Sequence, residues 1–105
     1  MVHTVQKQWG RQVWLNDSDQ LLLMNFGGIT SVHKHEYHKT RVMALQGYAR
    51  LIIGGVEESI GDSWRYIDSG VKHQITADTD CVLYEEYAPV NDIFQCTPEQ
   101  DIVRS

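Results

Sequence analysis

Histidines spaced for metal binding are the residues of this 105-residue chain that point most directly to chemistry. Side chains two residues apart in a β-strand share a face, so His33-Lys34-His35 predicts two imidazoles on one side and Lys34 on the other. His73 shares its parity with the apolar Ile75, which indicates that it points inward. Two imidazoles on a strand and a third from another segment suit a divalent ion. Each histidine alone would more often be a surface or hydrogen-bonded core residue, so the prediction rests on the three together.

Short β-strands separated by turn residues are the elements that must position these histidines. The histidine strand is expected at residues 31–37, and the others at 10–15, 20–26, 40–46, 48–53, 56–60, 63–67, 72–76 and 80–87. Gly54-Gly55 predicts a two-residue hairpin turn, because such turns need positive φ. Residues 20–26 are apolar enough to be buried on both faces, and 91–94 are expected to add an edge strand. The pattern predicts an all-β sandwich or small barrel.

Composition and charge exclude several classes of function. Nine Lys and Arg against fourteen Asp and Glu give a net charge of -5, which argues against a nucleic-acid partner. The two cysteines are too few for a disulfide framework, and neither a signal peptide nor a membrane-spanning run is visible. We therefore expect a cytoplasmic protein with a small-molecule ligand and no membrane partner. The short chain with its three tryptophans favours a homodimer.

Two stretches of the sequence resemble the motifs of a known family, the cupins. Residues 27–47 resemble the first motif, with its glycines and H-x-H, and residues 61–73 resemble the second, with one extra residue and with Asp68 where proline is usual. Residues 7–10, 82–87 and 101–104 are similar to the cupin domain of type II mannose-6-phosphate isomerases. The resemblance implies one cupin domain over 1–105, a double-stranded β-helix (jelly-roll barrel). Its core is expected at about 5–95 and a polar C-terminal tail at 96–105.

The acidic metal ligand of the cupin pattern is missing from its usual place. Counting seven residues back from Gly47 leads to Thr40, whose hydroxyl is a poor ligand for a divalent ion beside imidazole. Glu36 is too close to His35 and has the opposite parity, and His38 has the wrong parity unless the strand ends and bends after Glu36. Either three neutral histidines hold a zinc, manganese or iron ion, or the fold binds its ligand without metal. A three-histidine ion keeps its full charge, which favours an anionic ligand.

Three further residues are candidates for the chemistry of this site. Glu85 shares the parity of Leu83, so it is expected to point into the barrel as a general base, unless it is a solvated edge glutamate. Tyr48 and Arg50 share a face after the turn at Gly47, and together with Thr40 they are candidates to bind an anionic substrate. The alternative for Tyr48 and Arg50 is the outer surface of the barrel.

Three functions remain open from the sequence, and it does not decide whether the chain is an enzyme. The family resemblance implies isomerisation of a sugar phosphate, with Glu85 moving the proton. A three-histidine face with open positions could instead hold Fe(II) in a dioxygenase. The third function is a non-catalytic binding or sensor domain, which the loss of the acidic ligand favours. The identity of any bound metal discriminates among them.

Overall fold

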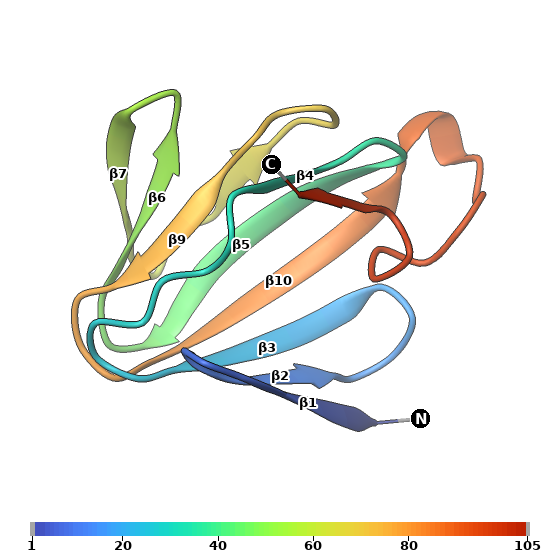
Figure 1. Ribbon diagram of the computed structural model, residues 1–105. Coiled ribbons are helices and arrows are strands. Elements are labelled where there is room, and N and C mark those ends of the chain that lie inside the picture. Colours follow the sequence, from blue (N-terminus) through green and yellow to red (C-terminus); the bar gives the residue numbers. More distant parts are fainter. Residues whose placement is uncertain (1, 105) are drawn as a thin grey trace.

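The computed structural model describes residues 2–104, which fold into β-strands and one short 3₁₀ helix, η1 (Val90–Asp92) (Figure 1). The strands are β1 (His3–Lys7), β2 (Gly10–Trp14), β3 (Asp19–Met24), β4 (His33–His35), β5 (His38–Gln46), β6 (Ala49–Ile53), β7 (Val56–Ile60), β8 (Arg65–Ile67), β9 (Gln74–Ala77), β10 (Cys81–Pro89) and β11 (Ile102–Arg104). They form a six-stranded sheet in the order β1-β2-β3-β10-β5-β8, a sheet β7-β6-β9 and a pair β11-β4. The all-β prediction is confirmed. None of the helical segments in residues 2–104 has the length and apolarity to span a membrane.

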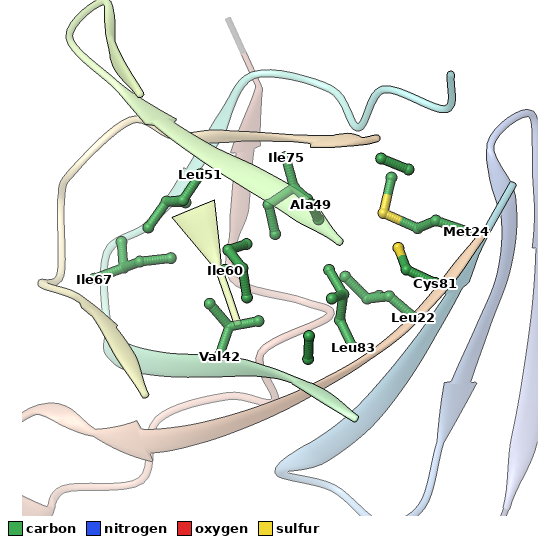
Figure 2. Packing of buried hydrophobic residues seen from close by; sticks show 12 residues of the cluster. Leu22, Met24, Val42, Ala49, Leu51, Ile60, Ile67, Ile75, Cys81 and Leu83 are labelled. Atoms are coloured by element: carbon green, nitrogen blue, oxygen red, sulfur yellow. The ribbon is translucent and has the colours of Figure 1, made fainter. Parts of the chain in front are cut away.

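The hydrophobic core lies between the six-stranded sheet and the β7-β6-β9 sheet (Figure 2). Buried and more exposed residues alternate along β5 and β10, so each strand turns one face inward. Val42 and Leu83 come from the large sheet, and Leu51 and Ile75 face them from the smaller one. Burying each such side chain stabilises the fold by roughly 1.5–3 kcal/mol. This packing fixes the parity of the strands that carry the polar residues described below.

Glycines allow the tight connections that set this register. Gly54 and Gly55 have φ of 58° and 79° and join β6 to β7, as the hairpin prediction requires. Gly47 directly follows β5 with a φ of 78°, and a Cβ atom there would lie 2.3 Å from the carbonyl oxygen of Asp80. The glycine that closes the first cupin-like motif is therefore required by a close backbone approach.

The strands predicted between residues 10 and 87 end within two residues of the observed ones, but the histidine strand is shorter and the strand at 20–26 is less buried than expected. The histidine strand is only β4, because the chain bends at Glu36 and Tyr37 before β5 begins. The strand predicted at 20–26 is β3, and it is buried on one face only, since Leu21 and Leu23 are half-buried while Leu22 is buried. Hydrophobicity alone did not reveal that the second face of β3 is partly open to solvent.

The C-terminal region also differs from its prediction. The edge strand expected at 91–94 is wrong, because Asn91 and Asp92 have φ of 57° and 58° and η1 occupies this place. Residues 102–104, expected in a polar tail at 96–105, form β11, which pairs with β4 (dark red in Figure 1). The structured barrel thus extends from β1 to β11, beyond the expected core at 5–95.

Candidate metal centre

Three histidines from two segments lie next to one another. His33 and His35 begin and end β4, and His73 directly precedes β9. The backbones of His33 and His73 exchange two hydrogen bonds, with N–O distances of 3.1 and 2.9 Å. Ring centroids are 4.5 Å apart for His33 and His73, and 5.3 Å apart for His33 and His35. One ring nitrogen from each histidine lies within 4.8 Å of the other two, so a single ion can be reached by all three.

Hydrogen bonds determine which ring nitrogen of each histidine is free. His33 Nδ1 donates to the carbonyl oxygen of Ser31 at 2.8 Å, and His73 Nδ1 donates to that of Val71 at 3.0 Å. A carbonyl only accepts, so these bonds leave the Nε2 lone pair of both rings available. Both ring nitrogens of His35 are buried without a partner among the described residues. An unpaired buried polar group costs about 1–3 kcal/mol, and a metal ion would relieve that cost. The free ring nitrogens of the three histidines are therefore suitable ligands for a divalent ion.

Burial keeps the three imidazoles uncharged. Burial, and after it the neighbouring His73, lower the pKa of His33 to about 4. Burial lowers the pKa of His35 to about 3, with His33 and His73 as the next causes. Burial also lowers the pKa of His73. All three rings are therefore neutral at physiological pH, which is the form that binds metal.

A buried carboxyl group shares a cavity with two of these histidines. Glu85, on β10, is 3% exposed and lines a cavity of about 50 Å³ together with His33 and His73. Gln20 Nε2 donates to Glu85 Oε1 and to the Tyr87 hydroxyl, both at 2.9 Å. Burial raises the pKa of Glu85 to about 7, and the bond from Gln20 opposes the rise. Near neutral pH this carboxyl can therefore both release and accept a proton.

Other residues of the cavity are not identified by the sequence analysis. Gln20 shares the parity of the buried Leu22 on β3, and Tyr87 shares that of the buried Leu83 on β10, so the same parity argument that found Glu85 could have found them. Lys7 and Arg104 also line the cavity. They come from opposite ends of the chain, and only the pairing of β1 and β11 with their neighbours brings them here.

Comparison with known proteins identifies the fold. No family model matches the sequence, and neither does any curated protein. Solved structures match at probability 1.00: oxalate decarboxylase from Bacillus subtilis covers 98% of this chain with a TM-score of 0.79 and 17% identity. The capsular polysaccharide assembling protein CapF from Staphylococcus aureus covers 99% with a TM-score of 0.73 and 16% identity. KdgF from Halomonas sp. covers 74% with a TM-score of 0.64 and 16% identity.

The chain has the cupin fold. It spans 30% of the oxalate decarboxylase chain, 34% of CapF and 74% of KdgF, so it corresponds to one part of the first two proteins. At these identities the likeness concerns the fold alone. The finer resemblance to type II mannose-6-phosphate isomerases stays a prediction.

Thr40 stands where the cupin pattern has its carboxylate, and the structure places it inside the barrel. It is 5% exposed and lies opposite Tyr87, whose ring is 4.9 Å from that of His35. Thr40 does not line the cavity that contains Glu85 but borders a separate hollow of about 250 Å³ beside β8. No carboxylate of β5 therefore joins the three histidines, and the expected contact between Thr40 and a bound substrate has no support in this geometry.

His38 points inward because β4 ends at His35 and the chain bends at Glu36 and Tyr37, next to the bend after Glu36 that the parity argument required. Its Nδ1 is 2.9 Å from Asp101 Oδ2, and both side chains are 2% exposed. Asp101 also accepts the backbone N–H groups of Glu36 and Tyr37 at 3.1 and 2.7 Å. Burial raises the pKa of Asp101, but the bond from His38 and those from the backbone outweigh burial and hold it below its ordinary value. Asp101 thus fixes the bend that ends the histidine strand.

Cys96 lies beside this pair and completes a second group of possible ligands. One ligand atom each of His38, Cys96 and Asp101 lie within 4.8 Å of one another. The oxygens of Asp101 already accept three hydrogen bonds, and burial raises the pKa of the Cys96 thiol. The cluster is therefore a weaker metal site than the three histidines.

Tyr48 and Arg50, expected to bind an anion, lie on the outside of the barrel. Tyr48 is 68% exposed, and Arg50 alternates with the buried Ala49 on β6. The Arg50 guanidinium bonds to Asp78 at 2.9 Å and to Glu57 at 2.9 Å. Neither residue lines the histidine cavity, so this geometry gives no support to their predicted role in substrate binding. The outer-surface alternative holds because Ala49, between them, is the residue that the core requires.

Proposed function

We propose that this chain binds one divalent metal ion through His33, His35 and His73 and acts on a small anionic molecule beside it. The observation that carries the proposal is the set of three neutral imidazoles with neighbouring, unshared ring nitrogens, two of which line the cavity that contains Glu85. Hydrogen bonds from Nδ1 to backbone carbonyls orient two of the rings, which is the usual support for metal-binding histidines.

The chemistry divides between the metal and the protein. A metal held here would polarise a bound carbonyl or hydroxyl group and stabilise negative charge on it. Glu85 would take up or return a proton, because its pKa of about 7 matches neutral conditions. Gln20 holds the Glu85 carboxyl in place through a bond of 2.9 Å. Such a pair suits proton transfer next to a carbonyl, as in the isomerisation of a sugar phosphate.

Two other functions are consistent with the same ligands. Three histidines without a carboxylate leave coordination positions for a substrate and dioxygen on Fe(II), as in a dioxygenase. A binding or sensor domain would keep the fold and the cavity without turnover. Thr40, which stands where the cupin pattern has its metal-binding carboxylate, favours this alternative over a cupin metal centre with all its ligands. A homodimer and a cytoplasmic location stay predictions from the sequence.

The test is the metal content of protein purified without added metal. The proposal expects about one equivalent of a transition metal, and its loss in His35→Ala. His3→Ala is the matched control, because His3 is exposed and pairs with Glu99 far along the chain. Zinc or manganese would favour the isomerase, and iron the dioxygenase. Protein that neither contains metal nor takes up zinc, manganese or iron after purification would overturn the proposal and leave the binding domain.

A further inference from the structure

Two cationic side chains lie at the mouth of the histidine cavity. Lys7 is the last residue of β1, and Arg104 is the last residue of β11. Both line the inner cavity of about 50 Å³ and an outer basin of about 330 Å³, which also share Trp9, Thr30 and Ser31. The two hollows therefore adjoin, with positive charge where they meet.

The register of β11 directs Arg104 toward this path. Arg104 is the antiparallel partner of His33, and residues directly opposite in such a pair have their side chains on the same face. Lys7 and Arg104 line the same cavity as His33, so both cations lie near that ring. The two cations therefore face the centre from its solvent side.

Neither cation is neutralised within residues 2–104. The ion pairs of that range engage Lys34, Arg41, Arg50 and Arg65 with acidic groups, but not Lys7 or Arg104. The chain carries fourteen acidic residues against nine basic ones, so acidic partners are abundant. Two cations that have no acidic partner among residues 2–104 and lie beside one cavity are a feature that an anionic ligand would explain.

The inner end of the cavity has a different chemistry. Gln20 Oε1 and Trp14 Nε1 are buried without hydrogen-bond partners among the described residues, and both side chains line the cavity. One is an acceptor and the other a donor, and a hydroxyl group satisfies both kinds. At about 10–15 Å³ for each water-sized group, 50 Å³ holds only a few non-hydrogen atoms. The inner end therefore suits a short hydroxylated fragment.

We propose that Arg104 and Lys7 bind the anionic group of a small hydroxylated acid or phosphate ester, whose hydroxylated end enters the cavity lined by Gln20 and Trp14. This inference names the ligand class of the site and rests on the proposed function. A guanidinium pairs with a carboxylate or a phosphate through two parallel hydrogen bonds, so either anion fits at the mouth.

The experiment measures binding by titration calorimetry and by fluorescence of Trp9 and Trp14, which line the site. The probes are glycerate, glycerol 3-phosphate, propionate, which lacks the hydroxyl groups, and glycerol, which lacks the charge. We expect glycerate or glycerol 3-phosphate to bind more tightly than propionate and glycerol. The tighter of the two anions identifies the carboxylate or phosphate source. Propionate or glycerol binding as tightly as both would overturn the inference.

Variants separate this inference from the metal proposal. Arg104→Gln should weaken the preferred anion roughly tenfold or more, since charge-assisted hydrogen bonds contribute about 1.5–3 kcal/mol, and Lys7→Gln should weaken it less. Lys39→Gln is the charge-matched control, because Lys39 is exposed on β5 and lines only the hollow beside β8. Equal affinity in Arg104→Gln and wild type would overturn the inference. Metal content is measured in every variant and should not change, so a protein without metal refutes the proposed function separately.

Discussion

The buried carboxyl group of Glu85 makes a quantitative prediction about stability and pH. Burial raises its pKa from 4.5 to about 7 in the folded protein. The unfolded chain therefore releases this proton at lower pH than the folded chain, and stability falls as pH rises from about 4.5 to 7. A difference of about 2.5 pKa units corresponds to about 3 kcal/mol, as an order of magnitude. This free energy is not reduced for screening by solvent, because Glu85 is only 3% exposed.

Glu85→Gln removes this titration while its amide oxygen can still accept the hydrogen bond from Gln20. In metal-free protein, the free energy of unfolding of the variant should rise by about 3 kcal/mol relative to that of wild type as the pH is raised from 4 to 8. Urea unfolding should show this as a relative change in midpoint of about 1–3 M. Comparing the two proteins at each pH cancels the contribution of the histidines, whose lowered pKa values reduce the stability of both proteins as pH falls below 6.5.

Glu86→Gln is the matched control for this experiment. Glu86 lies on the outer face of β10, where bonds from Arg41 and Tyr84 outweigh desolvation and lower its pKa. The stability that the Glu86 carboxylate contributes is present above its ordinary pKa and is lost as pH falls. The free energy of unfolding of Glu86→Gln should therefore show no gain over wild type as the pH rises from 5 to 8. A stability difference between Glu85→Gln and wild type that stays constant from pH 4 to 8 would refute the burial of an ionisable Glu85.

Three other predictions follow from the same residues. Asp101→Asn should lower the free energy of unfolding, measured in urea, by at least about 2 kcal/mol and should weaken metal binding, because the bend that ends β4 loses a carboxylate that accepts three hydrogen bonds. Unchanged stability and metal affinity would show that Asp101 does not position the histidine strand. Thr40→Glu should tighten metal binding and destabilise the metal-free protein, because the new buried carboxylate is paired with a cation only when the metal is bound. An unaltered metal affinity would place Thr40 outside the metal centre. Metal loading, measured after dialysis at each pH, should persist below pH 6.5 and be lost toward pH 4, where the lowered pKa of His33 lies; loading retained far below that pH would exclude the histidines as ligands.

Parity and turn chemistry predicted most of the fold. Alternation along 81–87 placed Leu83 and Glu85 inward, and the glycine pair at 54–55 located a hairpin. Parity also brought His33, His35 and His73 together, because a two-residue period survives errors in strand length. Local pattern was enough wherever the core on one side of a strand dictated which residues face inward.

Long-range pairing set the limits of that reasoning. Nothing local in residues 102–104 indicates that they pair with β4, so the sequence could not place Arg104 beside His33. The bend after His35 depends on Asp101, which is distant in the chain, so the inward direction of His38 stayed conditional. The sequence left Arg50 open between anion binding and the outer surface, and Asp78 and Glu57 on neighbouring segments hold it on the outer face.

The most direct test of the metal centre is the position of a bound ion in crystals. Crystals of protein loaded with one equivalent of zinc or manganese are measured at the absorption edge of that metal, and the anomalous difference map locates the ion. We predict one strong peak within bonding distance of a ring nitrogen of each of His33, His35 and His73, with Glu85 in the same cavity. A peak at His38, Cys96 and Asp101 instead, or none inside the barrel of fully loaded protein, would contradict the account.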